Sequence, residues 1–231
     1  MRNLTALAAL ALIAACGERP ASPAEPAAPV AEAPATPPPA PDDGAADGEQ
    51  GGLADWREVA STEDASRLGR LDQAWRLARA EAEDKGFADE VEALGPLVDP
   101  NAGLASQLQP PPGSYRCRAI KLGSNSPGGL GYLAYPWFRC TVELTSGGDL
   151  ILTKTTGSQR TRGLLYPDSE RRLVFIGAQA WGMDETGWPT YGQMPERDQI
   201  GVLERIGPER WRLVIPWPRV DSKLEILELA K

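Results

Sequence analysis

After the triple proline at residues 110–112, apolar and polar residues begin to alternate, and this alternation constrains the fold more than any other feature. Phe138 and Cys140 are apolar, whereas Arg139 and Thr141 are polar. A period of two residues predicts a strand with one buried face. Runs of this kind recur at residues 115–122, 138–144, 150–155, 162–166, 171–177, 200–206, 210–215 and 224–229.

Eight short strands with tight connections and no helix between them predict a closed or nearly closed antiparallel barrel, lipocalin-like in architecture. A two-sheet β-sandwich is the alternative. In the first strand Tyr115, Cys117 and Ala119 share one phase, but Ile120 and Leu122 fall on the other. We interpret this change of face as a β-bulge.

A helical segment at residues 55–98 precedes the strands. Ser61 supplies a capping hydroxyl and Asp64 an acid three residues later, which is typical of a helix start. Apolar residues then recur every three or four positions, at Leu68, Leu71, Trp75, Ala78 and Ala82. We predict one amphipathic helix from Ser61 to about Gly86 and a shorter one at 89–94. The fold class is therefore α+β, mainly β, with the helical segment packed on an eight-stranded barrel-like sheet.

The start of the chain reads as an export signal. Leu4 to Ala15 is an apolar run, shorter than the about 20 residues that span a bilayer as a helix. It ends in Leu-Ile-Ala-Ala-Cys-Gly, which resembles the bacterial lipoprotein lipobox. The resemblance implies that residues 1–15 are a signal peptide and that Cys16 is lipidated. Since Gly17 follows the cysteine, we expect an anchor at the periplasmic face of the outer membrane, in the cell envelope.

Residues 16–52 form the next segment, rich in alanine and proline and acidic towards its end. It has almost no large apolar side chains, so it is predicted to be a disordered tether rather than part of a core. A single folded domain is expected at residues 53–231, with its antiparallel β part at 113–231.

Composition excludes several functions. The chain of 231 residues contains no histidine, so histidine-based catalytic triads and histidine–metal sites are impossible. The formal charge of −8 lies mostly before residue 53, and the nearly balanced remainder has nothing to attract nucleic acid. We expect no cofactor and no metal.

Two cysteines remain once Cys16 is assigned to lipid. Cys117 and Cys140 lie on the apolar phase of their strands, so both are expected to point inward. In an oxidising compartment this pattern predicts a disulfide. A free thiol or a metal pair is the alternative, but no third soft ligand is present.

Polar residues that could bind a partner concentrate in loops. The candidate binding residues are Lys154, Ser158, Gln159, Arg160, Tyr191, Arg197 and Asp198. Arg160 could hold an anionic group, or Arg160 and Arg197 could instead form internal ion pairs with Asp168 or Asp198. A Ser158–Lys154 nucleophile pair and the carboxylates Glu185, Glu196 and Asp198 are the only catalytic options, and we assign none of them as catalytic.

The loop at residues 180–193 is aromatic. It contains Trp181, Trp188 and Tyr191, and Trp217 lies in a second connection. Such a loop over the mouth of a barrel would suit an apolar or carbohydrate ligand, or an exposed protein-binding patch. The alternative is that the rings only plug the end of the barrel.

The chain from Trp56 onward resembles a bacterial family known as domain of unknown function 4893. The matching stretches include Tyr115-Arg116-Cys117-Arg118, Phe138-Arg139-Cys140, Gly157-Ser158-Gln159-Arg160 and Glu204-Arg205-Ile206-Gly207. This resemblance implies no activity. At the level of architecture, the chain also looks like membrane-bound lysozyme inhibitors and lipocalin-like protease inhibitors, and Tyr115-Arg116-Cys117 is similar to the start of the former.

These features together favour a non-catalytic binding module. Its expected partners are the membrane, through the N-terminal lipid, and a small amphipathic ligand or an envelope protein. An envelope hydrolase that uses carboxylates or a Ser–Lys pair is the first alternative. An inhibitor of lysozyme or of a protease is the second.

Overall fold

The computed structural model describes residues 54–231. The signal peptide at 1–15, the lipidated Cys16 and the linker through residue 52 were predicted for the part of the chain that lies outside the described residues. Among residues 54–231, no helix combines the length and the apolar character that crossing a membrane requires.

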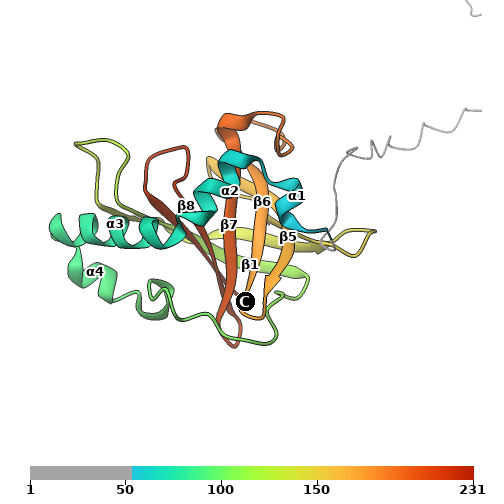
Figure 1. Cartoon of the computed structure of the whole chain (residues 1–231), viewed down its shortest axis with the longest axis horizontal. Coiled ribbons are helices and arrows are strands. Elements are labelled where there is room, and N and C mark those ends of the chain that lie inside the picture. Colours follow the sequence, from blue (N-terminus) through green and yellow to red (C-terminus); the bar gives the residue numbers. More distant parts are fainter. Residues whose placement is uncertain (1–53) are drawn as a thin grey trace, which may run out of the picture. The chain divides into compact units, whose positions relative to one another are not determined.

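Eight antiparallel strands close into a barrel, as predicted, rather than a two-sheet sandwich. The strand β1 pairs through its first half with β3 and through its second half with β9, which closes the ring (Figure 1). The short β2 pairs with the end of β1. The strands are β1 (Gly113–Leu122), β2 (Tyr132–Ala134), β3 (Phe138–Leu144), β4 (Leu150–Lys154), β5 (Gln159–Ser169), β6 (Arg172–Trp181), β7 (Asp198–Gly207), β8 (Arg210–Pro216) and β9 (Leu224–Ala230).

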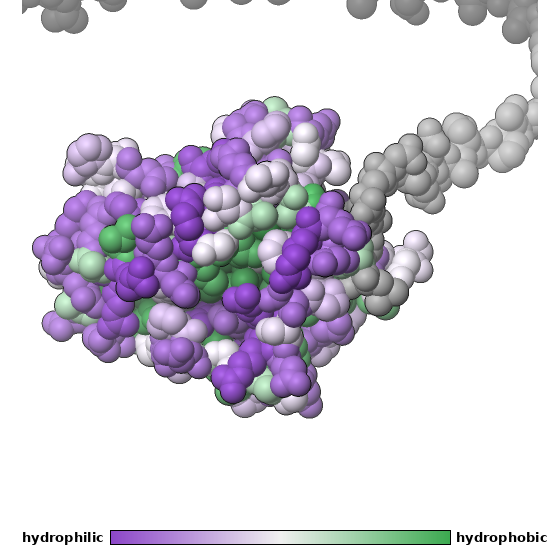
Figure 2. Space-filling model, in the orientation of Figure 1, coloured by the Kyte–Doolittle hydropathy of each residue, from purple (hydrophilic) through white to green (hydrophobic). Residues whose placement is uncertain are grey.

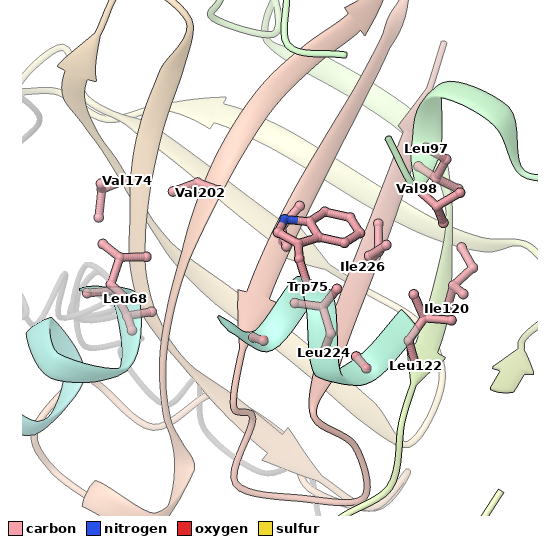
Figure 3. Close-up of a cluster of buried hydrophobic side chains, with 14 of the residues drawn as sticks. Leu68, Trp75, Leu97, Val98, Ile120, Leu122, Val174, Val202, Leu224 and Ile226 are labelled. Atoms are coloured by element: carbon pink, nitrogen blue, oxygen red, sulfur yellow. The ribbon is translucent and has the colours of Figure 1, made fainter. Parts of the chain in front are cut away.

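The helices lie on the outside of the barrel. They are α1 (Trp56–Val59), α2 (Thr62–Gly69), α3 (Leu71–Asp84) and α4 (Ala88–Glu92), followed by the 3₁₀ turn η1 (Gly95–Leu97). The helix α1 contacts β5, α2 contacts β7 and β8, and α3 contacts β1, β8 and β9. Figure 3 shows Trp75 of α3 lying over Leu224 and Ile226 of β9, in a core between the helices and the barrel wall.

The prediction of one long helix from Ser61 to about Gly86 is wrong, because the chain breaks between α2 and α3. Gly69 ends α2, and Arg70 leaves the helical conformation with φ −105° and ψ 21°. Glycine is a poor helix former. In addition, the indole N–H of Trp217 donates to the Arg70 carbonyl at 3.3 Å, so a tertiary contact holds the chain at the break.

The predicted β-bulge in the first strand is also wrong. The strand β1 pairs with β9 in unbroken register from Arg116 to Leu122. Ile120 and Leu122 face the helices, whereas Cys117 and Ala119 face the barrel interior. The apolar residues change phase because the helices bury the outer face of the strand as well.

A second core fills the barrel interior. Its members are apolar and come from every strand of the ring, with Phe175, Leu203, Leu213 and Leu227 almost completely buried. Toward one end the inward-facing side chains become polar, at Lys121, Lys154, Thr161, Gln179, Gln199 and Glu225. The barrel is therefore packed rather than hollow over most of its length.

The predicted disulfide between Cys117 and Cys140 is confirmed. It links β1 to β3 with a Cα–Cα distance of 5.9 Å and a sequence separation of 23 residues. Both cysteines lie in the interior core. The bond thus ties the strand that closes the ring to its neighbour.

Removing this disulfide should destabilise the domain. We expect the double variant Cys117→Ala/Cys140→Ala to lose about 3 kcal/mol of unfolding free energy, because the denatured chain regains the entropy of a loop of this length. Urea denaturation with and without reductant measures it. Reductant should lower the urea midpoint of the wild type and leave that of the double variant unchanged. An unchanged wild-type midpoint under reductant would contradict the prediction.

Candidate functional site

A cleft with a volume of about 660 Å³ lies on the outside of the barrel. In Figure 2 its floor is a green, apolar patch bordered by purple, charged side chains. Strands β4, β5 and β6 supply the floor, the segment from α1 to α2 supplies one wall, and residues 189–195 supply another. The apolar lining residues are Val59, Ile151, Leu164, Tyr166 and Ile176.

Helix α1 is held against the barrel beside this cleft. The Asp55 carboxylate caps it by accepting a hydrogen bond from the Arg57 backbone N–H at 3.1 Å. Trp56 is buried, and its indole N–H donates to Asp168 of β5 at 2.8 Å. Asp168 also pairs with Arg172 at 2.7 Å. A helix of four residues would not be stable alone, so these contacts fix the position of this wall.

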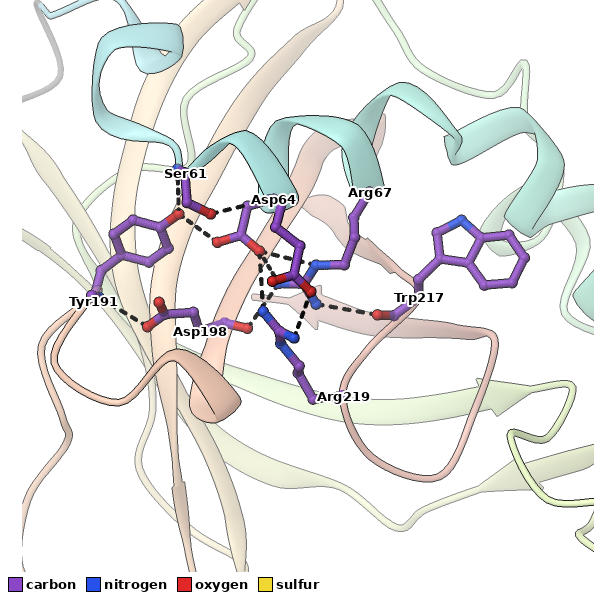
Figure 4. A network of polar contacts seen from close by, with 9 residues as sticks. Ser61, Asp64, Arg67, Tyr191, Asp198, Trp217 and Arg219 are labelled. Carbon is purple, nitrogen blue, oxygen red and sulfur yellow. Dashed lines mark hydrogen bonds and ion pairs between the residues drawn. The ribbon is translucent and has the colours of Figure 1, made fainter.

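Hydrogen bonds hold the loop that contains Tyr191 against the start of α2, as Figure 4 shows. The Tyr191 hydroxyl donates to the Asp64 carboxylate and accepts a hydrogen bond from the Ser61 backbone N–H at 2.9 Å. The Ser61 hydroxyl in turn accepts from the Asp64 backbone N–H at 3.1 Å. The residues of the helix cap therefore also hold the second wall of the cleft, which meets the first at these hydrogen bonds.

Asp64 is the centre of this network and is almost completely buried. The Arg67 guanidinium forms an ion pair with its carboxylate and also donates to the backbone carbonyls of Trp217 and Asp198, at 3.2 and 3.1 Å. Burial acts to raise the pKa of Asp64, but the hydrogen bonds from Tyr191 and Arg67 outweigh it, so the pKa is lowered. Burial and the Asp64 carboxylate raise the pKa of Tyr191 to about 12.

Asp198 lies at the start of β7 and lines the cleft. One carboxylate oxygen accepts a hydrogen bond from the Gly192 backbone N–H at 2.9 Å. Burial raises the pKa of Asp198, and the nearby negative charge of Asp64 adds to the effect. Two neighbouring carboxyl groups thus have pKa values displaced in opposite directions, an arrangement that is frequent at functional sites.

A family model described as domain of unknown function (DUF4893) matches residues 56–229. The chain belongs to this family. The match includes every helix and strand described above and both walls of the cleft. No curated protein and no solved structure matches the chain significantly.

In this DUF4893 domain the seven candidate binding residues fall in three separate places. Tyr191 and Asp198 line the cleft. Lys154, Ser158 and Gln159 line a smaller cavity at the polar end of the barrel. The third place is a cluster around Glu185 that contains Arg160 and Arg197.

The alternative interpretation, in which Arg160 and Arg197 form ion pairs with Asp168 or Asp198, has the wrong partners: no such pair forms among residues 54–231. Arg197 pairs with the Glu185 carboxylate. Arg160 donates to the Glu185 backbone carbonyl at 2.5 Å and lies over the Trp188 ring, 5.4 Å from its centre. The aromatic loop supplies both partners, because it folds back along the strand that carries Arg160.

Several residues that support or border the DUF4893 cleft carried no functional signal in the sequence. Asp64 and Arg67 occupy positions of an ordinary helix start, where charged residues are usually solvated. Only the tertiary fold buries them, next to Tyr191 from a loop about 130 residues away. The Arg219 guanidinium, which pairs with Glu63 at 2.7 Å at the rim, lies in an equally distant loop.

Replacing Tyr191 with phenylalanine should destabilise the domain in a pH-dependent way. The variant loses a hydrogen bond to a charged carboxylate, so we expect a loss of about 2 kcal/mol of unfolding free energy at pH 7. Because the folded pKa of Asp64 is lowered, its contribution is present above the unfolded pKa and is lost as the pH falls through the folded value. The deficit should therefore shrink below about pH 4.

Tyr132→Phe is the matched control for this measurement. Its ring packs against Phe87, and its hydroxyl makes no hydrogen bond within residues 54–231. The control should melt like the wild type at every pH. If the deficit of Tyr191→Phe were the same at pH 3 and pH 7, the Tyr191–Asp64 bond would not be its source.

Proposed function

We propose that this protein is a non-catalytic binding module of the cell envelope, tethered by lipid at Cys16, and that its outer cleft holds a small amphipathic ligand. The cleft carries this proposal. Its volume of about 660 Å³ lies within the range of about 300–1,000 Å³ that is typical of small-molecule sites. The apolar floor of this cleft favours an apolar group on the ligand.

The rim of the cleft favours a ligand with a zwitterionic head. Glu58, Glu63, Arg162 and Arg219 line it, so acidic and basic side chains border the same apolar floor. A head group of either single charge would meet repulsion from part of this rim. A single acyl chain with a zwitterionic head satisfies both the floor and the rim. A protein from the envelope is the other occupant that the test can reveal.

The disulfide supports the proposed compartment. Such bonds persist in exported proteins and are rare where thiols are kept reduced. Cys117 and Cys140 are bonded inside the barrel, which fits a domain that folds after export. A long tether would then let the domain reach ligands away from its lipid anchor.

Filling the cleft should abolish ligand binding. We expect N-phenyl-1-naphthylamine, an apolar fluorescent probe, to bind the full-length protein and to be displaced by a lysophosphatidylcholine. Val59→Trp places a large ring in the cleft from the α1 wall and should weaken probe affinity by about tenfold or more, since about 1.4 kcal/mol of lost contact corresponds to that factor. Fluorescence titration measures it.

The matched control is Leu77→Trp, which makes the same kind of change on an exposed position of α3. It should bind the probe like the wild type. Thr190→Trp blocks the cleft from its other wall and should repeat the effect of Val59→Trp. Equal probe affinity in all variants, or no binding by the wild type, would rule the cleft out as the ligand site.

Lipid anchoring is tested separately. In a bacterial host, we expect the full-length protein to fractionate with membranes and the Cys16→Ser variant to be released, because only an acylated cysteine supplies the buried methylenes of an anchor. Immunoblots of membrane and periplasmic fractions report the outcome. The Cys117→Ala/Cys140→Ala variant is the control and should stay with the membranes. If the Cys16→Ser variant also stayed with the membranes, the proposed lipid anchor would be wrong.

A further inference from the structure

Glu225 of β9 is a buried carboxylate without a partner. It faces the barrel interior and is 7% exposed. Among residues 54–231 nothing donates a hydrogen bond to its carboxylate, and no cation lies within ion-pair distance of it. Burying a charged group in this way is costly, and nearly all buried polar groups in native proteins are paired. The group therefore calls for an explanation.

The two lysines next to Glu225 are held by other groups. Lys121 is its direct cross-strand neighbour in the β1–β9 pair, yet the Lys121 ammonium donates to Gln159 Oε1 at 2.7 Å and to Asp221 Oδ2 at 2.9 Å. Lys154 donates to the Gln159 backbone carbonyl at 2.5 Å and lies 4.1 Å from the centre of the Phe138 ring. Both lysines thus contribute positive potential to Glu225 without touching it.

The titration behaviour of the site reflects this arrangement. Burial raises the pKa of Glu225, and the charges of Lys121 and Lys154 oppose the shift only in part. Burial lowers the pKa of Lys154 to about 8; the negative charge of Glu225 opposes this shift, whereas the positive charges of Lys121 and Arg160 add to it. The Glu225 carboxylate therefore has no direct donor, and the Lys154 ammonium has only a neutral carbonyl as its hydrogen-bond acceptor.

Glu225 and Lys154 line the same cavity, which has a volume of about 80 Å³ at the polar end of the barrel. Tyr135, Ser158 and Gln159 complete its polar lining. One water needs about 10–15 Å³ of such volume, so the cavity has room for a molecule of several heavy atoms. On its other side Glu225 borders a space of about 10 Å³, enough for a single water at most.

The chemistry of the lining defines the occupant. An ionised carboxylate only accepts hydrogen bonds, so Glu225 requires a donor from the ligand, ideally a cationic one. The Lys154 ammonium has three N–H donors, of which one is used by the Gln159 carbonyl, so it requires an anionic acceptor. We propose that this cavity binds a compact zwitterion, a small free α-amino acid, with its ammonium group on Glu225 and its carboxylate on Lys154.

A zwitterion fits better than a simple ion because it satisfies both groups and adds no net charge to a buried site. An anion alone would leave Glu225 unpaired, and a cation alone would leave Lys154 unpaired. This site is independent of the outer cleft, because the two have no lining residue in common. The two proposals can therefore fail separately.

Three matched probes test the zwitterion. Glycine carries both charges, glycinamide only the ammonium, and N-acetylglycine only the carboxylate. We expect calorimetric titration of the full-length protein at pH 7 to give glycine a Kd of about 1 mM or tighter, and each derivative to bind at least about tenfold more weakly. Equal binding of all three, or no binding of glycine, would overturn the proposal.

Two variants locate the site. Glu225→Gln and Lys154→Met remove one charge each, and buried charges replaced by neutral groups of similar size are often tolerated. Each should weaken glycine binding at least about tenfold. Glu228→Gln, on the outer face of the same strand, should bind glycine like the wild type, as should the cleft variant Val59→Trp. Unchanged glycine affinity in both Glu225→Gln and Lys154→Met would place any binding elsewhere and refute the assignment.

Discussion

The double pairing of β1 is the interaction on which the rest of the molecule depends. Its first half is bonded to β3 and its second half to β9, so one strand of ten residues closes the ring and leaves the sheet without a free edge at that point. The disulfide from Cys117 to Cys140 reinforces the β1–β3 half of this closure. The helices then cover the outer face of the second half, through Ile120 and Leu122.

Closure and helix packing decide where ligands can bind. Leu and Phe side chains fill most of the barrel interior, so the apolar lumen that a lipocalin-like ring could offer is used for stability. The two proposed sites therefore lie elsewhere, one between the helices and the barrel wall and the other at the polar end of the ring. Arg212 donates from a fully buried position on β8 to the carbonyls of Leu97 and Asp99, at 3.0 and 2.7 Å. Those bonds hold the end of the helical segment against the ring.

The sequence predicted the strands and the disulfide because both depend on local patterns, the alternation of apolar residues and the phase of two cysteines. It did not predict the site residues on the face of a strand or helix that the sequence pattern assigns to solvent but the tertiary fold buries. Glu225 stands between Leu224 and Ile226, which is the ordinary pattern of a solvated glutamate on a half-buried strand. Because helices bury Leu224 and Ile226 on the outside, Glu225 faces the interior instead. Asp64 illustrates the same limit, since its burial depends on Tyr191 and Arg67 rather than on its own helix.

Features that reduce the stability of the fold, namely buried carboxyl groups and strained backbone, lie together at one end of this barrel. Their location there is an argument for function. Asp198 and Glu225 both have raised pKa values there, and the connection between β8 and β9 holds Trp217 and Asp221 in the left-handed region, with φ of 51° and 70°. Backbone strain and unpaired buried charge both reduce the free energy of unfolding. They persist only where the surrounding contacts supply enough stability to offset this cost. The apolar packing of the remaining interior and the disulfide provide this stability. A barrel that served only as a scaffold would gain stability by replacing Glu225 with an apolar residue, whereas a barrel that binds a charged ligand has a physical reason to keep it.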